Sequence, residues 1–138
     1  MNHFIVHERL DEIRKNLGIL EELRQHSVQE FIQDPKIHKL AERCLQLCIE
    51  CVLDIAHYLI SQNNWSRPAD NTDAVIELGD HGVLPRDFAE AIAGMINFRN
   101  ILVHAYLKID RAIVFDHLNR LDNFRDFEKF LLEYLRKC

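Results

Sequence analysis

Residues that interrupt helices are scarce in this chain, which has four glycines and three prolines. Together they make up 7 of 138 residues, about 5%, whereas an average protein has about 12%. A β-sandwich or barrel needs many turns, and glycine and proline supply much of the backbone geometry of turns. The chain also contains 18 leucines and one threonine. This composition predicts an all-α fold.

Apolar residues recur at helical spacing near the start of the chain, at Leu10, Ile13, Leu17, Leu20 and Leu23. The pattern predicts an amphipathic helix over about residues 2–25. A longer helix is expected over about residues 36–61. Because this second segment is apolar nearly all round, it should lie at the centre of a bundle.

Capping residues divide the rest of the chain into shorter helices. Ser27 and Glu30 have the Ser-x-x-Glu form of a capping box and predict a short helix that Asp34-Pro35 ends. Further helices are expected over about residues 72–78, from Pro85 to His104, from Asp110 and from Asp122. We therefore expect a compact helical bundle with short accessory helices, in which residues 1–138 form one domain.

The formal net charge is −5, which argues against non-specific nucleic-acid binding, since that affinity comes mainly from lysine and arginine. The N-terminus has no pattern of a signal peptide. The most apolar stretch, residues 44–60, is interrupted by Glu50, Asp54 and His57, so we expect no membrane span. Four cysteines without a secretion signal indicate reduced thiols. The expected location is cytoplasmic.

Polar residues interrupt an apolar helix in the segment Asn97-Phe98-Arg99-Asn100-Ile101-Leu102-Val103-His104-Ala105-Tyr106. On a regular helix Asn100 and His104 share one face, and Arg99 and Tyr106 share another. Arg99 and His104 are separated by about 140° around the axis, so one straight helix does not bring them together. A helix that ends near His104, or a groove completed by a second protomer, would do so. The simpler alternative is that Arg99 pairs with a carboxylate and His104 donates to a backbone carbonyl.

Two further groups of residues lie on the long helix. Glu50, Asp54 and His57 form a polar stripe that could be half of a metal site, but the Glu-x-x-His repeat of di-iron bundles is missing. Pairing of Glu50 or Asp54 with a buried cation such as Arg99 is favoured instead. Three cysteines also share one face and could bind zinc; core packing is the favoured interpretation for Cys44, Cys48 and Cys51.

The element Arg99-x4-His104-x-Tyr106, with Asn100 directly after the arginine, resembles the signature of the HEPN superfamily and, within it, the HepT-like toxins. The resemblance covers most of the chain, including the early leucine stripe and the segment from Arg43 to Glu50. It implies a metal-independent endoribonuclease that is active as a homodimer and is the toxin of a toxin–antitoxin pair. It also implies an antitoxin, a minimal nucleotidyltransferase (MNT), that silences the toxin by attaching AMP to Tyr106.

The chemistry of these residues is compatible with that activity. RNA can be cleaved when the 2′-hydroxyl attacks the adjacent phosphorus, which requires a base, an acid and positive charge near the phosphorane. Histidine is suited to proton transfer near neutral pH, as at His104, and arginine binds phosphate oxygens with a planar set of donors, as at Arg99. A two-fold dimer would supply one histidine as base and the other as acid.

In this arrangement Asn100 would orient His104, Tyr106 would contact the substrate, and Glu50 and Asp54 would hold Arg99 from behind. No metal and no other cofactor is expected. Two alternatives differ in class: a helical module that binds RNA or a nucleotide without cleaving it, and a structural partner of a nucleotidyltransferase.

Overall fold

The computed structural model describes residues 3–104 and 109–137, with the backbone alone at positions 103 and 104. All regular secondary structure in these ranges is helical, which confirms the predicted all-α class. The elements in order are α1 (Phe4–Leu23), α2 (Val28–Gln33), α3 (Pro35–Gln62), α4 (Asn71–Asp80), α5 (Arg86–His104), α6 (Arg111–His117), the 3₁₀ turn η1 (Leu118–Arg120) and α7 (Asp122–Arg136).

The predicted capping box is present at the start of α2. The hydroxyl of Ser27 accepts a hydrogen bond from the amide of Glu30 at 3.2 Å, and the Glu30 carboxylate accepts one from the amide of Ser27 at 3.1 Å. Asp34 then ends α2 and caps α3, where its carboxylate accepts from the amide of Lys36 at 2.9 Å. Pro35 follows at the first turn of α3, where a missing amide hydrogen does no harm.

Of the two predicted aspartate caps in the C-terminal part, one is confirmed. Asp110 caps α6, and its carboxylate accepts from the amide of Ala112 at 3.0 Å. The prediction for Asp122 is wrong: it is the first residue of α7, and Leu121 occupies the cap position without a side-chain hydrogen bond. The reason is that η1 leads into α7 with helical backbone angles at Leu121, so the chain never leaves the helical region there.

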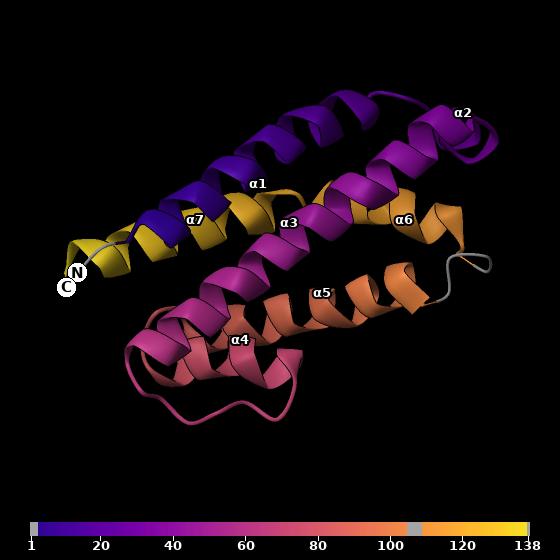
Figure 1. Ribbon diagram of the computed structural model, residues 1–138. Helices are drawn as coiled ribbons and strands as arrows, with labels where there is room; N and C mark the ends of the chain where they lie inside the picture. The colour runs from indigo at the N-terminus through magenta and orange to yellow at the C-terminus, as the bar shows by residue number, and fades with distance from the viewer. Residues whose placement is uncertain (1–2, 105–108, 138) are drawn as a thin grey trace.

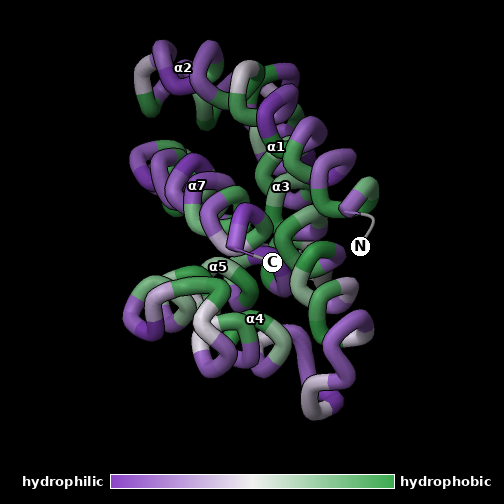
Figure 2. The backbone as a smooth tube through the Cα atoms, turned by 90° about the vertical axis from the view of Figure 1, so that its left-hand side faces the viewer, coloured by the Kyte–Doolittle hydropathy of each residue, from purple (hydrophilic) through white to green (hydrophobic). Residues whose placement is uncertain are grey.

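Helix α3 occupies the centre of the bundle, as predicted. Figure 1 shows α1 lying along one side of α3, while α4 and α5 form a pair on the other side. The short helices α2 and α6 contact each other near the start of α3. In Figure 2 the tube of α3 is largely hydrophobic, whereas the outer turns of α7 are hydrophilic. This arrangement places the motif helix α5 directly against α3.

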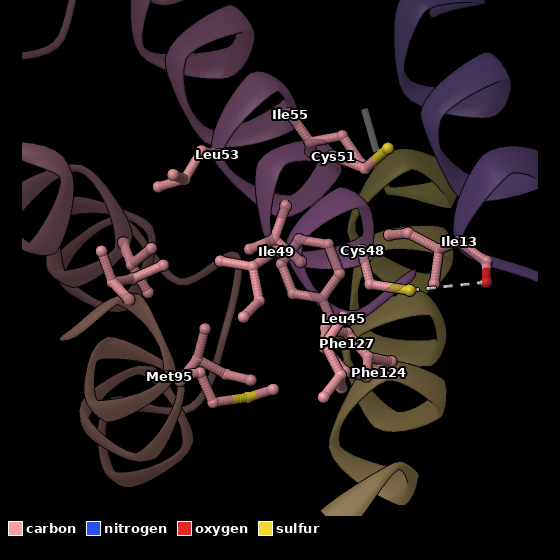
Figure 3. Packing of buried hydrophobic residues seen from close by; sticks show 14 of the residues in the cluster. Ile13, Leu45, Cys48, Ile49, Cys51, Leu53, Ile55, Met95, Phe124 and Phe127 are labelled. Carbon is pink, nitrogen blue, oxygen red and sulfur yellow. Dashed lines mark hydrogen bonds between the residues drawn. The ribbon is translucent and has the colours of Figure 1, made fainter. Parts of the chain in front are cut away.

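The core is formed by aliphatic and aromatic side chains that converge on α3. Figure 3 shows Ile13 of α1, Met95 of α5 and Phe127 of α7 gathered around Leu45 and Ile49 of α3. By length and composition alone α3 could cross a membrane. Its packing inside the bundle accounts for the same apolar composition, because most of its apolar side chains are buried by neighbouring helices.

Candidate active site

Helix α5 presents one buried side and one exposed side, and the first two polar residues of the motif, Arg99 and Asn100, lie where these sides meet. Its buried side packs into the core with Ile92, Met95, Ile96, Phe98 and Leu102. Its exposed side includes Asn97 and Ile101, of which Ile101 is 52% exposed. Arg99 and Asn100 are half-buried at the border. The packing of α5 therefore places the Arg99 guanidinium close to the surface, where it is only partly exposed to solvent.

The guanidinium of Arg99 has two partners among the residues that the structure describes. Its Nη2 donates to Oε1 of Glu50 on α3 at 3.3 Å, and its Nη1 donates to Oδ1 of Asn100 at 3.1 Å. The predicted pairing of Arg99 with a carboxylate of the long helix is thus confirmed for Glu50. The pair is 21% and 33% exposed, so the two charges are partly removed from water and depend on each other.

Glu50 is itself held in place by Gln46, one turn earlier on α3. The Nε2 of Gln46 donates to the same Oε1 of Glu50 at 3.0 Å. Gln46 was not among the predicted site residues, although its position four residues before Glu50 is the spacing of side chains that meet on a helix. Gln46, Glu50 and Arg99 therefore form a short chain of hydrogen bonds across the contact between α3 and α5.

The Arg99 guanidinium retains donor hydrogens that an anion could accept. A guanidinium carries five donor hydrogens, and Glu50 and Asn100 use one each. The Nε atom is buried and has no hydrogen-bond partner among the residues that the structure describes. A carboxylate behind the guanidinium and an amide at its side fix its plane, which favours two-pronged contact with a phosphate.

The other members of the polar stripe on α3 have partners on other helices. Asp54 accepts a hydrogen bond from Nε of Arg9 on α1 at 2.8 Å. The Nε2 of His57 lies 3.1 Å from Oδ1 of Asn71 at the start of α4. Glu50, Asp54 and His57 thus face three different helices. Among the side chains of residues 3–102 and 109–137, no three His, Cys, Asp or Glu gather so as to hold a metal ion.

The three cysteines of α3 are buried and free, which confirms the prediction that they pack in the core. Figure 3 shows Cys48 pointing towards α1, where its thiol donates to the carbonyl oxygen of Ile13 at 3.9 Å. Burial raises the pKa of Cys48 well above its usual range and raises that of Cys51 to about 11. Both thiols are therefore protonated at neutral pH and are poor nucleophiles and metal ligands.

The remaining predictions concern the end of the motif. Helix α5 is described as far as His104, and the side chain of His104 and the whole of Tyr106 lie outside the described residues. The side-chain oxygen of Asn100, which was expected to orient His104, accepts from Arg99. The proton-transfer role of His104 and the roles of Asn100 and Tyr106 stay predictions.

Sequence comparison places the chain among known nucleases. The family model described as "Ribonuclease HepT-like" matches residues 13–133. A tRNA nuclease HepT from Aphanizomenon flos-aquae is 32% identical over 111 residues, which cover 80% of this chain and 76% of that protein. An mRNA nuclease HepT from Shewanella oneidensis is 26% identical over 102 residues, covering 74% of this chain and 75% of that protein.

Structural comparison agrees with this placement. The tri-AMPylated HEPN toxin of Shewanella oneidensis, solved in complex with its MNT antitoxin, superimposes with a TM-score of 0.86. It is 22% identical, and the match covers 96% of this chain and 99% of that chain. The likeness establishes a common fold, and the family model establishes the relationship across most of the sequence. The chain belongs to the HepT-like ribonuclease family.

Proposed function

We propose that this protein is a metal-independent endoribonuclease and the toxin of a toxin–antitoxin pair. It cleaves RNA through attack of a 2′-hydroxyl on the adjacent phosphorus, leaving a cyclic phosphate. The observation that carries the proposal is the Arg99 guanidinium, held at the surface by Glu50 and Asn100 within a family-type Arg-x4-His motif. In this proposal it acts as a cytoplasmic protein with residues 1–138 as one domain.

Arg99 stabilises the negative charge that grows on the phosphate during the attack. Groups that are already oriented towards the developing charge give the largest single contribution to many enzymatic reactions. Glu50 and Gln46 supply that orientation, because they fix the guanidinium before RNA arrives. Asp54 pairs with Arg9 of α1, so in this proposal it supports the fold and not the orientation of Arg99.

His104 transfers the protons, and a homodimer supplies the second histidine that the reaction requires. The sequence spacing predicts that His104 follows Asn97, Asn100 and Ile101 on the exposed side of α5. That side is open at Gly94, where a side chain would meet nothing within 4 Å, and it carries the exposed Ile101. A second copy packed on this side of α5 would cover Ile101 and bring two motifs to one groove. Asn100 orients His104 within that groove.

Tyr106 contacts the substrate and is the site at which the activity is silenced. A solved HEPN relative is tri-AMPylated and bound to an MNT antitoxin. By analogy, the tyrosine hydroxyl here attacks the α-phosphorus of ATP on such a partner, which forms a phosphodiester and releases pyrophosphate. The added negative charge and bulk beside Arg99 then exclude RNA.

The proposal is tested by incubating purified protein with RNA in the presence of EDTA. We expect products with cyclic-phosphate ends, and a loss of about 10²–10⁴-fold in rate for His104→Ala, the usual range for one general acid or base. His57→Ala is the matched control. His57 is exposed, lies near the C-terminal end of α3 and is hydrogen-bonded to Asn71 of α4. Circular dichroism and gel filtration establish that each variant is folded.

Three outcomes would contradict the proposal. Cleavage that EDTA abolishes would indicate a metal-dependent reaction. Cleavage that is unchanged in His104→Ala would remove the histidine from the mechanism. Binding of RNA that stays intact would favour the non-catalytic binding module.

A further inference from the structure

A pocket of about 270 Å³ lies beside the motif, between α3, the end of α5 and the start of α6. Its lining includes Lys39, Glu42, Arg43, Gln46, Leu102 and Arg111. The predicted site contained none of these residues. They come from three helices, so only the folded chain brings them together.

The pocket is positively charged in a protein that is acidic overall. Lys39, Arg43 and Arg111 face one carboxylate, that of Glu42, which gives the pocket a formal charge of +2 within a chain of net charge −5. None of these four side chains forms an ion pair within 4 Å in the part of the chain that the structure describes. The nearby Asp110 uses its carboxylate to cap α6. The three cations are therefore available to an anion.

Two of the residues that line the pocket each have a buried polar atom that lacks a hydrogen bond to any described residue. These atoms are Nε of Arg111 and Oε2 of Glu42. A buried donor without an acceptor is unfavourable, and a bound anion would remove that cost at Arg111. Burial raises the pKa of Glu42, even though His38, Arg111 and Lys39 oppose the shift. Glu42 therefore lies close enough to Arg111 and Lys39 for their charges to act on it.

The pocket is continuous with the hydrogen-bond chain that holds Arg99. Gln46 lines the pocket and also donates to Glu50, the partner of Arg99. On α5, Leu102 lines the pocket and follows Arg99 by three residues, less than one helical turn. Along α3, Arg43 precedes Glu50 by seven residues, about 10 Å along the axis. A polymer of phosphodiesters bound at Arg99 could therefore extend into the pocket.

We propose that Lys39, Arg43 and Arg111 form a subsite for a phosphodiester of single-stranded RNA, adjacent to the linkage held at Arg99. Arg111 binds a phosphate oxygen at the base of the pocket, while Lys39 and Arg43 contact the same phosphate from the exposed rim. Glu42 limits the affinity by its negative charge. The subsite rests on the proposed nuclease function for its substrate, but its effect on binding can be measured without any cleavage.

The test measures binding of a short oligoribonucleotide in which every 2′-hydroxyl is methylated, so that the attacking group is blocked. We expect Arg43→Gln and Arg111→Gln each to weaken binding about tenfold, as for loss of a hydrogen bond to a charged group. Each change should also reduce the slope of log K against log salt concentration by about 0.7, the value for one phosphate contact on a single strand.

Two further variants separate electrostatics from folding. Glu42→Gln should bind about threefold more tightly, since it removes the one negative charge from the pocket. Arg43→Lys should keep the salt slope, because the charge is retained, and Arg43 is exposed enough for the protein to stay folded. Lys129→Gln on α7 is the matched control: it makes the same change of charge at an exposed position outside the pocket lining and should bind as wild type.

The outcomes for the subsite and for the nuclease are distinguishable. If unmethylated RNA is cleaved but Arg43→Gln and Arg111→Gln bind with wild-type affinity and salt slope, the subsite is wrong and the nuclease stands. Weaker binding by Glu42→Gln would also overturn the subsite, since it would indicate a structural role for this carboxyl. If the variants respond as expected while no RNA is cleaved, the subsite is supported and the nuclease fails.

Discussion

Helix α3 packs against α1 on one side and against α5 on the other, and the two contacts differ in chemistry. Towards α1 it presents Cys44, Cys48 and other apolar side chains that are fully or almost fully buried. Its ion pair with α1, between Arg9 and Asp54, lies at the exposed rim. Towards α5 it presents apolar side chains such as Ile49 (Figure 3) and also the polar Gln46 and Glu50, which are half-buried.

The two contacts of α3 have different roles: the contact with α1 stabilises the fold, and the polar part of the contact with α5 orients Arg99. Burial of apolar surface between α1 and α3 stabilises the fold and requires no partner of defined geometry. The ion pair of Glu50 and Arg99 loses part of its solvation, so it contributes little net stability even though breaking it is costly. A polar contact of this kind is better explained by the orientation that it gives to Arg99 than by the strength of the fold.

Among the changes that test this contrast between the two sides of α3, the largest effect is expected from changing Arg99 to lysine. Lysine keeps the positive charge but loses the planar set of donors. We expect Arg99→Lys to reduce the rate of RNA cleavage by about 10²–10³-fold, as when one oriented donor is removed from a transition state. The measurement is single-turnover cleavage at saturating protein.

Arg9→Lys is the control for this change, because it makes the same substitution at the ion pair between α1 and α3. Cleavage by Arg9→Lys should match that of the wild type. Equal losses in the two variants would mean that both sides of α3 serve only the fold, and the contrast between them would be wrong.

The sequence predicted the side of α3 that faces α1 more completely than the side that faces α5. Apolar spacing located α1 and α3 to within a few residues, because burial on one side of a helix leaves a periodic record in the chain. Capping chemistry predicted α2 and α6, since each cap is a local hydrogen bond. It failed at Asp122, where η1 supplies helical backbone before α7 begins.

On the side facing α5, the sequence predicted the pairing of Arg99 with a carboxylate but not the rest of the arrangement. Nothing in the spacing of Glu50 and Asp54 decides which of them meets Arg99, because that depends on the angle at which α5 crosses α3. The same holds for the pocket, where Arg111 meets Lys39 and Arg43 from positions about seventy residues away. Contacts between segments far apart in the chain produce no repeating pattern in the sequence from which they could be predicted.

A smaller effect, confined to stability, is expected from Cys48→Ser on the side that faces α1. The change places a hydroxyl in a fully buried apolar site, where the thiol makes a long hydrogen bond of 3.9 Å to the carbonyl oxygen of Ile13. We expect the free energy of unfolding to fall by about 1–3 kcal/mol, the usual range for a poorly bonded buried polar group. Urea denaturation measures the change.

Cleavage by Cys48→Ser should stay at the wild-type rate per folded molecule. A loss of cleavage at a temperature where the variant is fully folded would show that the two sides of α3 are coupled. The contrast between a stabilising side and a functional side would then have to be abandoned.

The smallest effect concerns His117, the last residue of α6, which packs against the buried side of α5. Its ring stacks on that of Phe98, the neighbour of Arg99, with centroids 3.7 Å apart. Burial, and next the nearby Arg120, lower the pKa of His117, and Asp116 opposes this only in part. Above the ordinary pKa of about 6.5 the imidazole is neutral in both the folded and unfolded chain, so it adds no pH dependence. As the pH falls through that value the unfolded chain takes up the proton more readily, and the folded state loses stability.

His117→Phe keeps an aromatic ring against Phe98 without the titration, so it should lose less stability than the wild type between pH 7.5 and 5.5, roughly one unit either side of that pKa. Urea denaturation at the two pH values measures the difference, and equal losses would mean that the buried side of α5 does not resist protonation of this histidine.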